Sequence, residues 1–141
     1  MVFVGTYEHT LDTKGRLVLP SKFRSHFADA AYLSPGAGCI SLWTPVRFEE
    51  HVHRLEEEAR KGDTSQDVLR GLASKSEEVR PDAQGRIMMP TRLQTFANLD
   101  REIIICGNIH HIEIWNASSW TAMADELDES VEIAFRQGSG I

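Results

Sequence analysis

The sequence predicts an α+β protein built as a tandem repeat of one β-rich unit, with each repeat ending in a helix. The main observation is a motif, Asp-x-x-Gly-Arg-[Leu/Ile]-x-[Leu/Met]-Pro, that occupies residues 12–20 and returns at residues 82–90. The copies stay aligned downstream, where Ile-Ser-Leu-Trp at 40–43 matches Ile-Glu-Ile-Trp at 112–115. A unit of about 55–60 residues would be only marginally stable alone, because small domains bury too little surface. The two repeats are therefore expected to form one body with pseudo-two-fold symmetry.

The composition is that of an ordinary globular domain. The 141 residues are 41% hydrophobic and 26% charged, and the net charge of −6 argues against broad nonspecific binding to nucleic acid or anionic membranes. The two cysteines, Cys39 and Cys106, are too few for a disulfide framework and favour reduced thiols in a cytosol. The sequence contains neither a membrane-spanning apolar stretch nor a signal peptide, so we expect a soluble cytoplasmic protein.

Each unit is predicted to begin with strands on both sides of the motif. In the first unit, Val2–Val4 and Thr6–Leu11 are rich in β-branched and aromatic residues, and Leu17–Leu19 resumes the strand. The Asp-x-x-Gly between them is typical of a hairpin turn, because glycine accepts a positive φ and aspartate binds nearby backbone amides. Pro20 lacks an amide proton and should end the strand.

The rest of each unit is predicted as a short helix, two strands and a long helix. Phe23 and Phe27 at helical spacing predict the short helix, whose counterpart covers residues 91–97. The strands are expected at 31–33 and 39–43, with counterparts at 102–106 and 111–115. Thr44 and Pro45 are typical of a helix start, as N-cap and first helical residue, and Gly62 is typical of a helix end. The second long helix is expected to be capped by Asn116 or Ser118.

These elements divide the chain into a first repeat, a linker and a second repeat. The boundaries are residues 1–60, 61–76 and 77–136, with a brief helix in the linker. Residues 137–141, Gln-Gly-Ser-Gly-Ile, are expected to be a disordered tail.

The arginine of each motif is a candidate contact to nucleic acid. Arginine can donate to both O6 and N7 of guanine, and a two-stranded β-ribbon fits the major groove of DNA. The alternative is that Arg16 and Arg86 only pair with Asp12 and Asp82 and brace their own turns. The motif alone leaves both interpretations open.

A comparison of the two copies favours the first turn as the main contact. Residues 12–24 carry Lys14, Arg16, Lys22 and Arg24 against one aspartate, a net +3, whereas residues 82–94 carry a net +1. Because phosphate attraction grows with local positive charge, the first turn is expected to dominate affinity. Thr13 and Lys14 join Arg16 and Arg86 as predicted DNA contacts. The turn-shaping residues are predicted to be Asp12, Gly15, Asp82 and Gly85, and the secondary phosphate contacts Lys22 and Arg24.

The residues around both turns resemble the MraZ family, bacterial regulators of the division and cell-wall gene cluster. The similarity rests on Phe-Val-Gly-Thr-Tyr-Glu-His-Thr-Leu-Asp-Thr-Lys-Gly-Arg at residues 3–16 and on Asp-Ala-Gln-Gly-Arg at 82–86. The resemblance implies a SpoVT-AbrB-like swapped-hairpin fold and assembly into a ring of subunits. It also implies binding to G-rich direct repeats upstream of the protein's own operon, with the Asp-x-x-x-Arg elements at Asp12/Arg16 and Asp82/Arg86 touching the DNA.

Together with this resemblance, the turn motifs predict a homo-oligomeric, nucleoid-associated transcriptional regulator that represses its own operon by binding double-stranded operator DNA. The competing interpretation is an antitoxin-like or transition-state-type regulator that acts through a protein partner. Catalysis is disfavoured, because no nucleophile elbow or phosphate-binding glycine loop is present. No cofactor or metal is expected either, since His51, His53 and the pair His110-His111 lack metal-ligand spacing.

Overall fold

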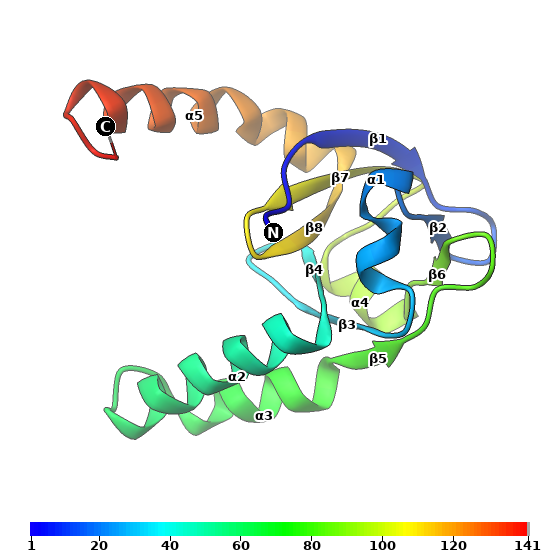
Figure 1. The fold of residues 1–141 in the computed structure, drawn as a ribbon, viewed down its shortest axis with the longest axis horizontal. Coiled ribbons are helices and arrows are strands. Elements are labelled where there is room, and N and C mark those ends of the chain that lie inside the picture. The colour runs from blue at the N-terminus through cyan, green and yellow to red at the C-terminus, as the bar shows by residue number, and fades with distance from the viewer. Residues whose placement is uncertain (141) are drawn as a thin grey trace.

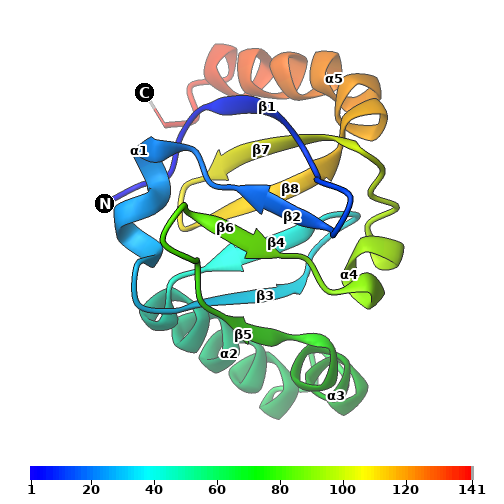
Figure 2. The same ribbon diagram turned by 90° about the vertical axis from the view of Figure 1, so that its right-hand side faces the viewer.

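The computed structural model describes residues 1–140, which form three layers (Figure 1). A six-stranded antiparallel sheet lies in the middle, with the two-stranded ribbon of β2 and β6 and the short helices α1 and α4 in front of it (Figure 2). The long helices α2, α3 and α5 lie behind it. The strands are β1 Thr6–Thr10, β2 Arg16–Val18, β3 Ala31–Pro35, β4 Ile40–Trp43, β5 Glu77–Val79, β6 Arg86–Met88, β7 Glu102–Asn108 and β8 His111–Asn116. The helices are α1 Ser21–Arg24, α2 Pro45–Arg60, α3 Gln66–Lys75, α4 Thr91–Phe96 and α5 Ala117–Arg136.

The two repeats exchange strands. The sheet order is β1-β7-β8-β4-β3-β5, so β1 of the first repeat pairs with β7 of the second, and β5 of the second pairs with β3 of the first. In the ribbon, β2 pairs with β6, again across the repeats. Replacing each strand by its counterpart in the other repeat gives the same order read from the opposite edge of the sheet, which is the predicted pseudo-two-fold arrangement. The fold class is therefore confirmed.

The hairpin prediction needs a correction. The residues between β1 and β2 do form a tight turn, in which the Gly15 amide donates to the Asp12 carbonyl at 3.0 Å. However, β1 and β2 do not pair with each other, because each finds its partner in the other repeat. The turn therefore carries the chain from the central sheet to the ribbon.

The core lies between the sheet and the ribbon. Strand residues that alternate toward this space are fully buried, as are the inward residues of the ribbon, Leu17 and Ile87. Phe23 and Phe27, predicted at helical spacing, are both buried and contact Phe3 edge-on and stacked, respectively. Apolar side chains from both repeats thus share one core.

The long helices begin and end where the sequence predicts. The Thr44 side chain accepts from the Arg47 amide at the start of α2, Pro45 is its first residue, and Gly62 follows its end with φ +82°. Asn116, the first of the two predicted caps, accepts from the Ser119 amide at the start of α5.

Two segments differ from the prediction, and a third, the linker helix, is present where it was predicted. Residues 2–4 form only a single bridge between Phe3 and Ile109, because Gly5 with φ +99° interrupts the strand. The linker helix is a ten-residue helix, α3, which packs against α2 and β3. Residues 137–140, expected to be disordered, form a turn that closes α5, with the Ser139 amide donating to Ala134. Ile141, the end of that expected tail, lies outside the described residues.

Candidate nucleic-acid interface

The outer face of the β2–β6 ribbon presents both motif arginines. In a strand, side chains alternate between the two faces, so burial of Leu17 and Ile87 turns their neighbours outward. Arg16 lies opposite Met88, and Arg86 lies opposite Val18, in the antiparallel register. The outer face therefore carries two arginines on one diagonal and two exposed apolar side chains, Val18 and Met88, on the other.

Each turn is closed by its aspartate. Oδ1 of Asp12 accepts from the amides of Lys14 and Arg16, both at 2.9 Å, while Oδ2 accepts from Nε of Arg16 at 2.7 Å. The second turn repeats this arrangement, with Asp82 accepting from the amides of Gln84 and Arg86 and from Nε of Arg86 at 2.6 Å. Each aspartate thus accepts hydrogen bonds from three donors within its own turn.

These hydrogen bonds keep the aspartates ionised. The hydrogen bond from the Arg16 amide, helped by its guanidinium and by the Lys14 amide, lowers the pKa of Asp12 from its usual value. The amide and guanidinium of Arg86, with the Gln84 amide, lower the pKa of Asp82 in the same way. Each arginine is thus held beside a negative charge at neutral pH.

The bracing leaves the distal end of each guanidinium free. Of the three guanidinium nitrogens, only Nε donates a hydrogen bond to the aspartate of its turn. Within residues 1–140, neither Nη atom of Arg16 or Arg86 has a hydrogen-bond partner. The Nη atoms are the donors needed for bidentate contact with a guanine edge or a phosphate. Bracing and DNA contact, which the sequence set against each other, are therefore compatible, and bracing would pre-organise the contact.

The structure corrects the placement of Arg24. The sequence grouped Arg24 with the first turn, but strand exchange places its side chain against Gly85 in the second turn. Its Nη2 donates to the Leu19 carbonyl at 2.9 Å, and the side chain is partly buried. The net +3 predicted for the first turn is thus divided between the two turns, and the first turn has less excess charge than the sequence indicated. Lys22 and Lys14 are both exposed.

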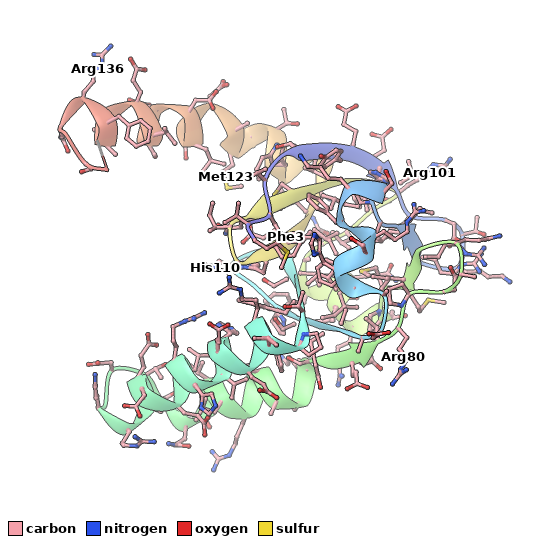
Figure 3. The ribbon with its side chains drawn as sticks, in the orientation of Figure 1. Phe3, Arg80, Arg101, His110, Met123 and Arg136 are labelled. Carbon is pink, nitrogen blue, oxygen red and sulfur yellow. The ribbon has the colours of Figure 1, made fainter. Side chains whose placement is uncertain are left out.

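One cation near the first turn was missed. Arg101 lines a hollow of about 490 Å³ together with Asp12, Lys14 and Gln94. Figure 3 shows Arg101 at the same end of the molecule as the turns, and the Arg101 carbonyl accepts from the Leu11 amide at 2.8 Å. Only the β1–β7 register brings Arg101 to this turn, and no local pattern in the sequence indicates that register.

The histidines that might have suggested a metal site are used otherwise. The rings of His51 and His111 both stack against Trp43, with centroids 4.4 and 4.2 Å from that of the indole, and His53 is exposed beside Glu56. Within residues 1–140, no group of three or more His, Cys, Asp or Glu side chains could hold a metal ion. Cys39 and Cys106 are free and buried, and burial raises the pKa of the Cys106 thiol to about 12.

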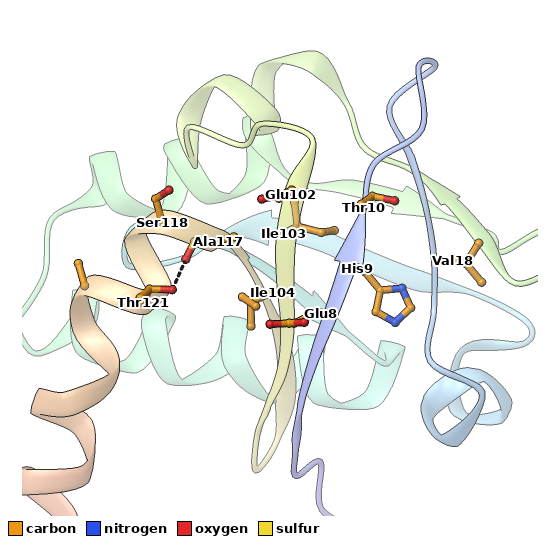
Figure 4. Close-up of a pocket in the computed structure, with 11 residues that line it drawn as sticks. Glu8, His9, Thr10, Val18, Glu102, Ile103, Ile104, Ala117, Ser118 and Thr121 are labelled. Carbon is orange, nitrogen blue, oxygen red and sulfur yellow. Dashed lines mark hydrogen bonds between the residues drawn. The ribbon is translucent and has the colours of Figure 1, made fainter.

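Another hollow lies between β1, β7 and the start of α5, and Val18 of the ribbon is among its lining residues (Figure 4). Its volume is about 1020 Å³, and its lining includes Glu8, His9 and Glu102. Two carboxylates make this hollow unsuited to a phosphate. Among residues 1–140, no helix is long and apolar enough to cross a membrane.

Comparison with known proteins gives the family. The sequence model of the family described as "MraZ protein, putative antitoxin-like" matches residues 2–71 and again residues 72–137. The chain is 33% identical over 140 residues to the Transcriptional regulator MraZ of Corynebacterium diphtheriae, covering 99% of this chain and 95% of the relative. It is 34% identical over 129 residues to that of Saccharopolyspora erythraea, covering 91% and 90%. It is 32% identical over 134 residues to that of Mycolicibacterium smegmatis, covering 94% of each.

These relatives are named as regulators of transcription and not as enzymes. The two matches of the family model together span both repeats and meet between residues 71 and 72. The resemblance inferred from the two turn motifs is confirmed, and the chain belongs to the MraZ family.

Proposed function

We propose that this protein is a DNA-binding regulator of transcription that reads operator DNA with the outer face of the β2–β6 ribbon. The observation that carries the proposal is the pair of braced arginines, Arg16 and Arg86, which share one face of a slim ribbon and whose Nη atoms have no hydrogen-bond partner within residues 1–140. A two-stranded ribbon of this kind fits the major groove. The names of the relatives, which are transcriptional regulators, support the same function.

The test is a gel shift on the double-stranded DNA upstream of the protein's own gene. The expected result is a complex that persists in the presence of excess random-sequence duplex, because direct base contacts give specificity beyond phosphate attraction. Equal binding to both DNAs, or binding to neither, would reject the proposal.

The finer proposal is that the operator consists of G-rich direct repeats and that binding represses the protein's own operon. Arginine suits guanine-rich sites because its two terminal donors match O6 and N7. A repressor that binds DNA near its promoter would act in the cytoplasm, on the nucleoid. A footprint of the upstream region, read together with transcript levels of the operon, tests the operator and the direction of regulation.

We also propose that the chain forms a homo-oligomer, and specifically a ring. The support comes from α5, which extends away from the body (Figure 1) without a second helix beside it. On α2, which packs against α3, Val52 and Leu55 are half-buried. Their counterparts on α5 are Ala124 and Leu127, and Leu127 is exposed, as is Val131 one turn further along. An uncovered apolar stripe of this kind marks an interaction site.

A ring fits direct repeats in DNA. Head-to-tail contacts between subunits repeat the same orientation, whereas a two-fold dimer calls for a palindrome. Several ribbons on one ring would bind together and raise the apparent affinity of a chain whose net charge is −6.

Replacing Val131 by glutamate should break the assembly. A charge in the α5 stripe would have to be buried without a partner, so the mass in solution is expected to fall toward the 15.9 kDa monomer. Ile133→Glu is the matched control, because Ile133 is comparably exposed (46% against 54%) but lies on the opposite side of the helix. A wild-type chain that is already monomeric, or equal effects of both variants, would contradict the proposed role of the stripe.

Replacing Lys14 by glutamine copies the second repeat, which has Gln84 at this position. The exposed Lys14 is expected to contact a phosphate, so the variant should bind all sequences more weakly. The slope of log affinity against log salt should become shallower by about one phosphate contact per site. An unchanged slope would remove Lys14 from the set of phosphate contacts.

A further inference from the structure

The Arg24 side chain links helix α1 to the turn of the other repeat. Its Nη2 donates to the Leu19 carbonyl at 2.9 Å, and the Leu19 amide in turn donates to the Gly85 carbonyl at 2.9 Å. The guanidinium lies directly over Gly85, where an added Cβ would come within 2.3 Å of Nε. Gly85 precedes Arg86 in the chain, so this link holds the backbone immediately before the second motif arginine.

Gln94 on α4 makes the equivalent link to the first turn. Its Nε2 donates to the Met89 carbonyl at 2.8 Å, and the Met89 amide donates to the Gly15 carbonyl at 2.8 Å. An added Cβ at Gly15 would come within 2.6 Å of the same Nε2. Gly15 precedes Arg16, so each turn is supported by a helix from the opposite repeat.

The backbone conformation is a second reason why positions 15 and 85 favour glycine. Gly15 has φ +78° and Gly85 has φ +77°, in the left-handed region that side chains disfavour. The absence of a side chain at each turn also opens the space that Gln94 or Arg24 fills. The link and the backbone conformation therefore depend on the same residue.

A comparison of the links separates charge from geometry. Arg24 and Gln94 occupy equivalent places and each donates one N–H to an equivalent carbonyl, although one side chain is charged and the other is neutral. What the two share is the donated hydrogen bond and the packing over a glycine. The geometry of the link therefore recurs at both turns, whereas the charge of the linking side chain does not.

We propose that Arg24 is a positioning residue for Arg86, and Gln94 a positioning residue for Arg16, so that each DNA-binding turn is held by the other repeat. The inference rests on the proposed function of the ribbon. It replaces the phosphate-contacting role that the sequence predicted for Arg24. It also makes each turn depend on the other repeat, because neither keeps its geometry without a helix from the other half of the chain.

The test is a set of double-mutant cycles in which affinity for the upstream DNA is measured at low salt, where weakened complexes remain measurable. Arg24→Ala is expected to lower affinity about tenfold, the equivalent of a lost hydrogen bond to a charged group. In an Arg86→Ala background that loss should shrink to less than about twofold, whereas in an Arg16→Ala background it should persist in full. Gln94→Ala should show the reverse pattern, coupling to Arg16 and not to Arg86.

A rescue variant distinguishes a positioning role of Arg24 from a role of its charge. Arg24→Gln, which copies the first-turn link, should retain affinity within about twofold, because the donated hydrogen bond is preserved. A loss as large as that of Arg24→Ala would mean that Arg24 acts through its charge and would overturn the inference. If Arg24→Ala does not fold, Arg24→Met keeps the packing over Gly85 while removing the donors, and takes its place in the cycles.

The cycles also separate failure of this inference from failure of the proposed function. Coupling of Arg24 to Arg16, or equal coupling to both arginines, would overturn the cross-repeat links while leaving DNA binding intact. If Arg16→Ala and Arg86→Ala both bind the upstream DNA like wild type, the ribbon is not the DNA-binding surface and the proposed function itself fails.

Discussion

Arg16→Ala is expected to lower affinity for operator DNA by roughly 10- to 100-fold, the range that one bidentate arginine–guanine contact provides. Affinity for random-sequence duplex should fall much less, because phosphate contacts from other cations remain. The fold should survive, since the Arg16–Asp12 ion pair is close to the surface and such pairs contribute at most about 1 kcal/mol. Competition gel shifts, with thermal unfolding as a check on the fold, measure both effects.

Three further variants sharpen this result. Arg16→Lys keeps the charge but loses the planar fork, so it should restore random-sequence affinity without restoring specificity. Asp12→Asn keeps an acceptor for the turn amides but replaces Oδ2, which accepts from Nε, with an NH2 group that cannot accept, and should give an intermediate loss. Arg70→Ala removes an exposed arginine from α3, away from the ribbon, and should bind like wild type. If Arg16→Ala binds the operator normally or unfolds, Arg16 serves only to brace its turn.

The sequence predicted the site well where the information is local. The repeated motif places an aspartate, a glycine and an arginine in one tight turn, and the structure has Asp12 holding the amide and Nε of Arg16 as the spacing suggests. The cap at Thr44 and the stop at Gly62 are equally local, because the residues that satisfy the helix ends are neighbours in the chain.

The sequence could not predict which turn each cation would serve. Arg24 is nine residues from Gly15 in the chain, yet it lies against Gly85, and Arg101 reaches the first turn through β7. Both placements follow from strand exchange, which depends on the pairing of β1 with β7 and of β2 with β6. Pairing between distant strands is decided by the whole core, so a charge count along a sequence window assigned Arg24 to the wrong turn.

Strand exchange also changes what the duplication means for stability. The strands β1 and β2 hydrogen-bond only to strands of the second repeat, and β5 and β6 only to strands of the first, whereas β3–β4 and β7–β8 pair within their own repeats. The core between sheet and ribbon likewise draws side chains from both halves. We infer that the repeats cannot unfold one at a time, although the family model matches each of them separately.

Replacing either inward ribbon residue, Leu17→Ala or Ile87→Ala, should therefore destabilise the whole chain. Both side chains are at most 1% exposed, and truncations of this kind cost about 2–5 kcal/mol, a large share of the 5–15 kcal/mol typical of a domain. Unfolding should remain a single transition, shifted down by roughly 6–20 °C for a chain of this size. Val18→Ala, on the outer face of the same strand, is the control and should cost less than about 0.5 kcal/mol.

Calorimetry at one fixed protein concentration measures these shifts, because assembly makes the midpoint depend on concentration. The expected outcome is that Leu17→Ala and Ile87→Ala move the same transition, although one substitution lies in each repeat. Two separate transitions, with each variant moving only one, would mean that the repeats are independent units, and the cross-repeat support proposed for the DNA-binding turns would lose its basis. A single shared transition would instead mean that the geometry of the ribbon face is set by the whole molecule, because the strand that presents Arg16 is held in place by the strand that presents Arg86.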